Sequence, residues 1–391
     1  MEKVKGKRML SFLFYRTIAE ENNMEIPKAE AEKSLRGSRE AFTENLNDNL
    51  TLLEHRIQKK ELVCKRLRIG RRTQTETALV YLADIAYEEI VDAAWHRLQM
   101  IDIDGVMDSG TAEQLLKENV WSPFPQYQAT ERPDRTAQAL LDGRVAILFD
   151  HAPEALLLPA TLDTMFQTND DYYRHFEVVT FLRIIRYLAA FLAFSLPGLY
   201  VAANCFHTQM LPTKLVLSMA KAREGVPFPT IVEVLLLELS FELIREAGLR
   251  MPGAIGNTIG IVGGLIIGQS AVSANLVSPM TVVVVALTAL GSFSVPNEEF
   301  SEALRLIKYC NIFLGGFLGI FGLVLGWYLL VLHLAGLKSY GIPYLTPFSA
   351  PEINDYQDMR DSIVRYPLRK MRRRPVFARK EQRIRLQKDD M

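Results

Sequence analysis

The chain has 391 residues, and its 45 lysines and arginines balance 45 aspartates and glutamates, so the formal net charge is zero. This length leaves room for about two or three domains. The neutral balance excludes bulk electrostatic attraction to nucleic acid, so we expect no nucleic acid partner. The three cysteines, Cys64, Cys205 and Cys310, lie too far apart in sequence to indicate a disulfide framework or a zinc site.

Residues 1–34 are polar and irregular, and we expect them to form a leader that precedes the folded part. From residue 35 to residue 173, helical spacing of apolar residues alternates with short apolar runs of strand length. This alternation predicts a soluble α/β domain over residues 35–173. The helices are expected at residues 42–57, 88–100, 111–119 and 133–142, and the strands at residues 62–69, 77–83, 145–149 and 155–158.

Residues 178–335 are predicted to form an α-helical polytopic membrane domain. Uncharged apolar stretches near 20 residues long are what a bilayer core requires. A further helix at residues 230–247 is acidic, so we expect either four or five spans. The four clean stretches are residues 178–203, which carry Arg183 and Arg186 only near their start, 253–277, 280–295 and 311–334.

Small residues repeat at four-residue spacing in the second of these stretches. Such a ridge lets two helices approach closely in lipid, and two further glycines repeat the pattern in the last stretch. Gln269 and Ser273 lie on the face opposite the ridge. They are either satisfied inside a packed bundle or exposed to water in a pore. The predicted packing glycines are Gly256, Gly260, Gly264, Gly268, Gly315 and Gly319.

The acidic helix at residues 230–247 places Glu238, Glu242 and Glu246 in one stripe, together with Arg245. Carboxylates at membrane depth are costly and usually functional, so these three are candidates for the lining of a polar path. The alternative is a helix that lies at the membrane interface with its acidic stripe in water.

The C-terminal segment helps to choose between these placements. Residues 352–391 contain twelve lysines and arginines against seven acidic residues. The positive-inside rule therefore predicts that residues 336–391 form a basic cytoplasmic tail, and Arg183 and Arg186 place the soluble domain on the same side. Two cytoplasmic ends require an even number of crossings. Four clean spans satisfy this, which favours an interfacial or re-entrant placement of residues 230–247.

The candidate motifs for catalysis and metal binding in the sequence are incomplete. Asp102 and Asp104 precede Gly105 as in a calcium loop, but the aligned first and twelfth positions are Met100 and Thr111, which are not carboxylates. The sequence contains no GxxxxGK[ST] phosphate loop, and its six histidines are scattered. We therefore expect a protein that is not an enzyme and that has no metal site and no cofactor.

Ordered motifs along the chain point to a known family. They include Arg36-Gly-Ser-Arg-Glu, Ile69-Gly-Arg-Arg-Thr, Trp121-Ser-Pro-Phe-Pro, Thr130-Glu-Arg-Pro-Asp, Gly143-Arg-Val-Ala-Ile-Leu, Ala222-Arg-Glu-Gly-Val-Pro-Phe-Pro and Pro343-Tyr-Leu-Thr-Pro. From about residue 35 to the tail, the sequence resembles the A subunit of the GerA-type spore germinant receptors. Members of this family usually carry another soluble subdomain before the arginine-glycine motif, where this chain has only some 35 residues.

The resemblance implies an integral protein of the inner spore membrane that works with a B subunit and a C subunit. It also implies a homo-oligomer, in contact with membrane lipid, that forms or gates a cation path and so triggers germination. Two alternatives stay open. One is a solute transporter that binds its substrate at the acidic stripe, although we find no internal repeat of the kind secondary transporters show. The other is a non-conducting scaffold for the germinant-binding B subunit.

Overall fold

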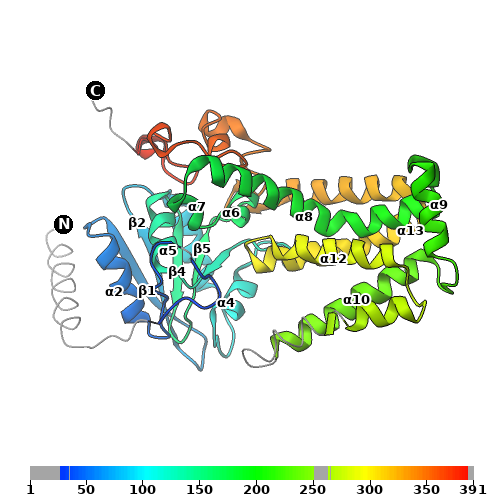
Figure 1. Ribbon diagram of the computed structural model, residues 1–391. Helices are drawn as coiled ribbons and strands as arrows, with labels where there is room; N and C mark the ends of the chain where they lie inside the picture. Colours follow the sequence, from blue (N-terminus) through cyan, green and yellow to red (C-terminus); the bar gives the residue numbers. More distant parts are fainter. Residues whose placement is uncertain (1–26, 35, 251–262, 265, 386–391) are drawn as a thin grey trace, which may run out of the picture.

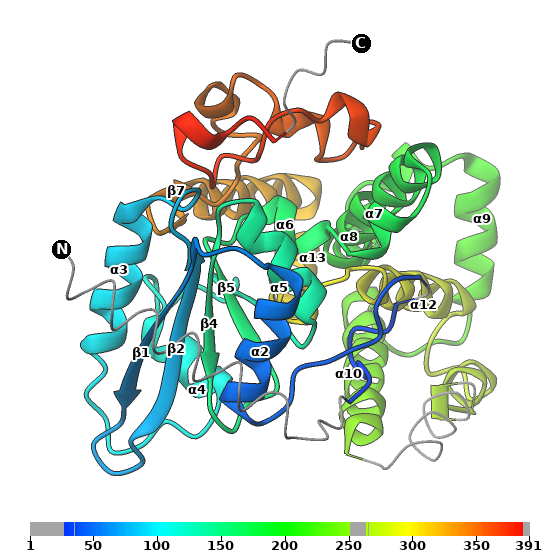
Figure 2. The ribbon, with the colours of Figure 1, turned by 90° about the vertical axis from the view of Figure 1, so that its left-hand side faces the viewer.

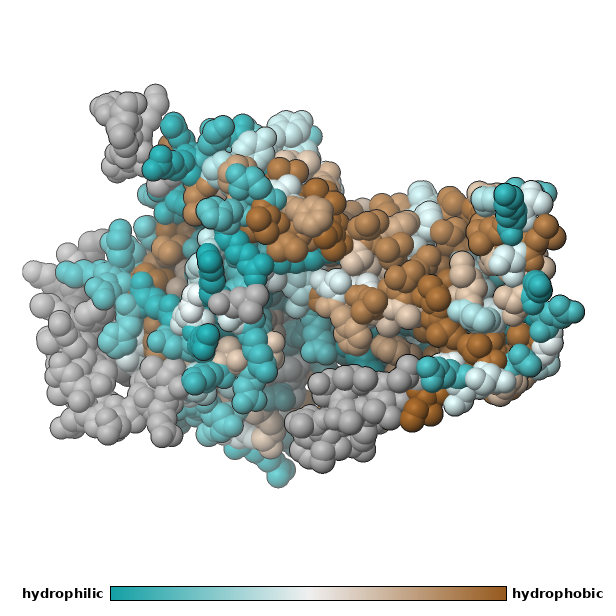
Figure 3. Space-filling model, in the orientation of Figure 1, coloured by the Kyte–Doolittle hydropathy of each residue, from teal (hydrophilic) through white to brown (hydrophobic). Residues whose placement is uncertain are grey.

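A sheet domain lies at one end of a bundle of helices in the computed structural model, which describes residues 27–34, 36–250, 263–264 and 266–385 (Figure 1). The last part of the chain packs beside the sheet domain. The visible surface is largely polar over the sheet domain and largely apolar over the bundle (Figure 3). The predicted mixed helix and sheet domain is therefore confirmed, and the chain continues from it into a bundle of apolar helices.

The sheet has five strands in the order β1-β2-β4-β5-β3, and every neighbouring pair is antiparallel. β4 and β5 are buried along their whole length, which explains why both are continuous apolar runs in the sequence. The short β3 at the far edge carries no apolar run and was not predicted. The strands are β1 (Leu62–Ile69), β2 (Thr75–Leu82), β3 (Gln128–Thr130), β4 (Val145–Phe149) and β5 (Ala155–Leu158).

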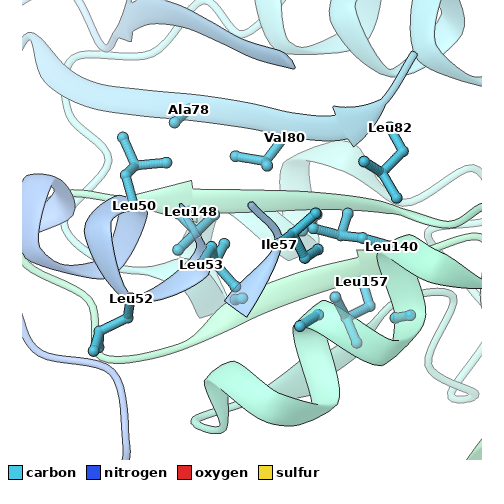
Figure 4. Packing of buried hydrophobic residues seen from close by; sticks show 14 of the residues in the cluster. Leu50, Leu52, Leu53, Ile57, Ala78, Val80, Leu82, Leu140, Leu148 and Leu157 are labelled. Atoms are coloured by element: carbon cyan, nitrogen blue, oxygen red, sulfur yellow. The ribbon is translucent and has the colours of Figure 1, made fainter. Parts of the chain in front are cut away.

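Helices cover both faces of this sheet. On one face α2 (Leu46–Arg56) and α5 (Pro133–Leu141) pack against β2, β4 and β5 (Figure 4). On the other face α3 (Glu88–Gln99) and α4 (Ser109–Leu116) pack against the alternate side chains of the same strands. Local signals place these helices: the Asn45 side chain caps α2, and Pro133 begins α5, where its missing N–H costs nothing.

The helix bundle begins after two short helices, α6 (Leu162–Phe166) and α7 (Asp170–Tyr173). Its longest helices are α8 and α13, and both are long and apolar enough to cross a membrane. α12 is apolar but shorter, with 15 residues. The bundle contains α8 (Phe176–Cys205), η1 (Thr208–Met210), α9 (Thr213–Ala222), α10 (Thr230–Leu249), a helix whose described part ends at residue 273, α12 (Pro279–Phe293) and α13 (Glu298–Gly336).

α13 reverses its direction at Gly319. Straight, its 39 residues would extend about 58 Å, nearly twice the roughly 30 Å of a bilayer core. Instead, Phe300 near its start and Leu334 near its end share one apolar cluster. Gly319 has φ 65° and ψ −147°, a conformation that is essentially restricted to glycine. Residues 298–318 and 320–336 are therefore two arms of a helical hairpin.

This reversal corrects the prediction of a single last span over residues 311–334. Glycines at four-residue spacing were interpreted as a packing ridge on one straight helix, but Gly319 is the turn between the two arms. The part of the chain that the structure describes contains two helices that pass the length and composition test for a span, where four or five spans were expected. Much of the predicted span 253–277 lies outside the described residues.

Residues 337–385 fold onto the sheet domain. Tyr344 and Ala378 are buried, and the backbone N–H of Arg379 donates to the carbonyl of Ile85. Gly143 has φ 93°, and a Cβ there would lie 2.6 Å from Cα of Ala378, so glycine lets the tail approach α5. The tail elements are β6 (Lys338–Ser339), β7 (Ile342–Pro343), η2 (Pro351–Asn354), η3 (Asp358–Arg360), η4 (Leu368–Lys370) and η5 (Lys380–Gln382).

The sheet domain and the tail lie at the same end of the bundle (Figures 1 and 2). The chain therefore leaves the sheet domain through α8 and returns to it at the end of α13. This arrangement agrees with an even number of passes along the bundle.

Candidate functional site

Four charged side chains meet in the middle of the bundle, between α10 and the first arm of α13. Lys308 Nζ lies 2.6 Å from Oε2 of Glu238 and 3.3 Å from Oε1 of Glu242. Arg305 Nη1 lies 3.1 Å from Oε2 of Glu242. The side chains of Lys308 and Glu238 are 4% and 1% exposed, so this pair is removed from solvent. We call Glu238, Glu242, Arg305 and Lys308 the mid-bundle cluster.

The helix geometry produces this cluster. Glu238 and Glu242 are four residues apart on α10, and Arg305 and Lys308 are three residues apart on α13, so each helix directs two like charges along one face. The opposite charges then meet where the two helices pack. Each member lies near the midpoint of its helix or arm.

The two basic partners were missed by sequence reasoning, which began the last span at Asn311. Arg305 and Lys308 lie in a run of apolar residues that begins at Leu304. A basic pair at three-residue spacing in such a run is the pattern from which these partners could have been predicted. Two placements of the acidic stripe were left open, and the one that faces water at the membrane interface does not fit Glu238, because α10 packs within the bundle and Lys308 neutralises this carboxylate.

Glu246 is not part of the cluster. It is exposed and pairs with Arg250 four residues later, with 2.6 Å between Oε1 and Nη2. Of the three carboxylates proposed to line one polar path, the structure brings Glu238 and Glu242 together and leaves Glu246 at the surface.

A second buried carboxylate, Glu233, lies at the end of the bundle far from the sheet domain. Its Oε2 accepts hydrogen bonds from Ser278 N at 2.9 Å and Thr281 Oγ1 at 3.1 Å, and Arg223 Nη2 lies 3.1 Å from its Oε1. Ser278 is the N-cap of α12, so the negative charge stabilises the positive end of that helix dipole. We assign Glu233 a structural role.

Arg183 is the centre of a third cluster, where the bundle meets the sheet domain. Its Nε lies 3.0 Å from Oδ2 of Asp171, and its Nη1 lies 3.0 Å from Oδ1 of Asp361 in the tail. Nη1 of Arg186 also lies 2.8 Å from Oδ2 of Asp171. We call Arg183, Arg186, Asp171 and Asp361 the junction cluster. It joins α7, α8 and the tail.

Burial and the arginines of the junction cluster act in opposite directions on the pKa of nearby carboxyl groups. Burial raises the pKa of Asp361, although the charge of Arg183 opposes that rise. For Asp171 burial acts in the same direction, but hydrogen bonds from Arg186 and the charge of Arg183 hold its pKa below the usual value. The carboxylate of Asp163, on α6, accepts hydrogen bonds from the side chains of Gln167 and Tyr187. Burial raises the pKa of Asp163 to about 7.

Arg183 and Arg186 were used as positive flanking charges to orient the first span. The structure pairs both with buried acidic groups, so they supply little net charge at the membrane surface. The prediction that the soluble domain and the tail share one side therefore depends on their packing together rather than on these two arginines.

The predicted polar face of residues 253–277 is partly described. Gln269 and Ser273 are exposed, on a helix surface that no other part of the described chain covers. A Cβ on Gly264 would meet nothing within 4 Å, and one on Gly268 would make only ordinary contact with Val282 at 3.6 Å. Gly256 and Gly260 lie outside the described residues.

Close helix packing occurs instead around α8. A Cβ on Gly315 would lie 2.6 Å from the carbonyl oxygen of Gly198, and a Cβ on Gly198 would lie 2.7 Å from that of Asn311. A Cβ on Gly291 of α12 would likewise lie 2.6 Å from the carbonyl oxygen of Ala189 in α8. Small residues at these crossings bring backbones into contact. Gly198 and Gly291 were not among the predicted packing positions, since neither belongs to a regular repeat.

No group of three or more His, Cys, Asp or Glu side chains is arranged to hold a metal ion within the described residues. The three cysteines are free and exposed. The charged clusters are therefore built from ion pairs and hydrogen bonds.

The chain is similar to known proteins over most of its length. The family model described as Bacillus/Clostridium GerA spore germination protein matches residues 9–377. Spore germination protein KA of Bacillus subtilis is 40% identical over 364 residues, which cover 93% of this chain and 66% of that protein. The uncharacterized membrane protein YfkQ of the same organism is 42% identical over 347 residues, covering 88% of this chain and 66% of that protein.

A solved structure also matches. The N-terminal domain of the A subunit of the Bacillus megaterium spore germinant receptor GerK3 is 40% identical, with a TM-score of 0.27, and the match covers 31% of this chain and 97% of that domain. The chain spans 66% of the length of the first relatives it matches.

Proposed function

Because the chain belongs to the GerA family of spore germination proteins, we propose that it is the A-type membrane subunit of a spore nutrient germinant receptor. The subunit works with a B and a C subunit in the inner spore membrane. Its sheet domain and tail face the cytoplasm. Two further relatives of the chain are the spore germination proteins B1 and A1 of Bacillus subtilis.

We further propose that the subunit oligomerises and forms or gates a cation path. The mid-bundle cluster is the observation that carries this proposal. Buried charges in the middle of an apolar bundle are costly, and they persist where a transport path or a switch requires them. The cluster contains two acidic and two basic side chains, so it has no net charge to attract cations while it is paired. We therefore assign it to gating rather than to a cation-selective ring.

The conducting surface is better supplied by Gln269 and Ser273. Both are exposed in the single chain, and amide and hydroxyl dipoles can replace part of the water around an ion. In a homo-oligomer these side chains would repeat around a central axis. Gly264, with open space around it, would then lie at the contact between neighbouring chains.

Ion flux through the purified chain in liposomes tests the path. We expect cation flux from the wild-type chain, a strong reduction in Gln269→Leu, which removes the amide dipole, and nearly normal flux in Gln269→Asn, which keeps it. Absence of flux from correctly inserted wild-type protein would favour the non-conducting scaffold. Saturable uptake of a solute without ion flux would favour the transporter.

Oligomer assembly is tested separately with two glycine variants. Gly264→Leu should leave the stability of the single chain unchanged and lower the yield of cross-linked oligomers. Gly291→Leu is the control, because its new side chain would clash with α8 inside the same chain and should lower stability itself. A normal oligomer yield in Gly264→Leu would show that this surface is not part of the contact between chains.

A further inference from the structure

The loop that follows α4 exposes large apolar side chains. Trp121 is 95% exposed, the highest value among the large apolar residues of the described chain, and its neighbour Val120 is 72% exposed. Leu115, on the last turn of α4, is 45% exposed. Trp121 begins the Trp-Ser-Pro-Phe-Pro motif, to which neither the bundle clusters nor the proposed path assigns a role.

The loop holds Trp121 in a defined position. Gln126 Oε1 accepts hydrogen bonds from Glu118 N at 2.8 Å and Asn119 N at 3.1 Å, and Gln126 Nε2 donates to Asn119 O at 2.9 Å. Asn119 Oδ1 then accepts from Trp121 N at 3.2 Å. These hydrogen bonds fix the backbone of the loop at Trp121, so the exposure of its side chain does not arise from a loose chain.

The residues that follow Trp121 bind the end of the helix bundle. Ser122 Oγ lies 2.9 Å from Nε2 of His333, near the end of α13. The Phe124 ring packs against Phe300, near the start of α13, with 5.6 Å between ring centroids. Trp121 therefore lies beside the level at which both arms of α13 meet the sheet domain.

This level is the boundary of the apolar surface of the bundle. Leu332 is 49% exposed, one residue before His333, and Leu306 on the first arm of α13 and Phe293 at the end of α12 are 59% and 60% exposed. If these side chains face lipid, the headgroup layer begins where they end. Tryptophan is enriched at that layer, since its ring is apolar and its indole N–H binds water or headgroups.

We propose that Trp121, with Val120 and Leu115, is an interfacial anchor that inserts into the headgroup layer of the membrane crossed by α8 and α13. The proposal rests on the membrane placement in the proposed function. The anchor fixes the sheet domain against the bilayer surface, so that the domain cannot tilt freely around the start of α8. The occupant is lipid, because the loop that carries the patch contacts the end of the bundle, next to helices with exposed apolar side chains.

The three tryptophans of the chain provide the test and its controls. Full-length protein is reconstituted into vesicles as three variants, each with two tryptophans changed to phenylalanine, so that only Trp121, Trp95 or Trp327 remains. Emission is then compared in lipids brominated near the headgroup and lipids brominated near the chain ends. Trp327 lies within α13 and reports the bilayer core, and Trp95 lies on the sheet domain.

We expect Trp121 to be quenched most by bromine near the headgroup, Trp327 to be quenched by bromine in the chains, and Trp95 to be unaffected. Trp121 that is unquenched while Trp327 is quenched would overturn the anchor and leave the membrane placement intact. Loss of quenching at Trp327 as well would overturn the membrane placement. Trp121 emission that changes with the protein-to-lipid ratio, without lipid quenching, would assign the patch to a second copy of the chain and overturn the lipid assignment.

Discussion

The mid-bundle cluster and the junction cluster use the same chemistry in different ways. At the junction, Arg183 binds two carboxylates and also donates to the carbonyl of Ser362, and Arg186 donates to the carbonyl of Phe166. In the middle of the bundle, the contacts of the cluster join side chains of two helices only. Opening the junction would break backbone contacts across three segments. Separating α10 from α13 would break only side-chain contacts of the mid-bundle cluster. This cluster is therefore better suited to a movement that opens a path.

The largest effect is expected from Lys308→Met. The change leaves Glu238 buried without its cation, and breaking a buried pair in this way typically costs about 3–5 kcal/mol. The melting temperature in detergent should fall strongly. The matched control is the double variant Glu238→Gln with Lys308→Met, which removes both charges and should recover much of the loss. A single variant as stable as the wild type would show that the pair contributes nothing to stability.

A pH-dependent effect is expected from Asp163, beside the junction cluster. Its pKa of about 7 in the folded chain lies above the value of 3.8 expected when unfolded, so the folded state binds the proton more tightly. The contribution to stability is complete below about pH 4 and is lost as the pH rises to 7. At about 1.4 kcal/mol per pKa unit, the difference is on the order of 4 kcal/mol.

Asp163→Asn should remove this pH dependence and stabilise the chain near neutral pH. The charged and titratable groups around the site, Arg183, Asp361 and Tyr187, are unchanged in the variant. Thermal melts from pH 4 to pH 8 compare the two proteins. Parallel melting curves at all pH values would mean that Asp163 is ionised throughout this range.

A smaller effect is expected from Arg183→Lys. Lysine keeps the charge but cannot reproduce the forked contacts to Asp171 and Asp361, and each hydrogen bond to a charged group contributes about 1.5–3 kcal/mol. The tail should become easier to cleave in limited proteolysis while the bundle stays folded. Unchanged cleavage would show that Arg183 does not contribute to the attachment of the tail.

The position of the mid-bundle cluster also depends on the turn in α13. Gly319→Ala places a Cβ at φ 65° and ψ −147°, where non-glycine residues are strained by about 1–3 kcal/mol. The Cβ would also lie 2.8 Å from Cε1 of His207. We expect a moderate loss of thermal stability. Gly336→Ala is the control, because nothing lies within 4 Å of that position.

The smallest effect is expected from Glu246→Gln. Glu246 and Arg250 are exposed and form an (i, i+4) pair, which contributes no more than about 0.5 kcal/mol. The melting temperature should change little, in contrast to that of Lys308→Met. A large loss would show that Glu246 has a buried partner in the assembled protein.

The sequence by itself determined the nature of each region. Continuous apolar runs predicted β4 and β5 at the bounds observed, because strands buried on both faces require them. The apolar stretch after residue 178 predicted α8, and ordered motifs identified the family. These signals are local, because each can be recognised within a short stretch of the chain.

Tertiary structure alone decided how the helices pair. The hairpin in α13 depends on the φ and ψ of Gly319, whose spacing from Gly315 is equally compatible with a straight helix. The partners of Glu238 and Glu242 are more than 60 residues away, and the spacing along one helix contains no information about which face of another will meet it. The tail contains basic residues typical of a free cytoplasmic segment, but the close approach of Ala378 to Gly143 places it in the folded domain. Long-range packing determines these contacts, because the free energy of burial depends on which surfaces meet.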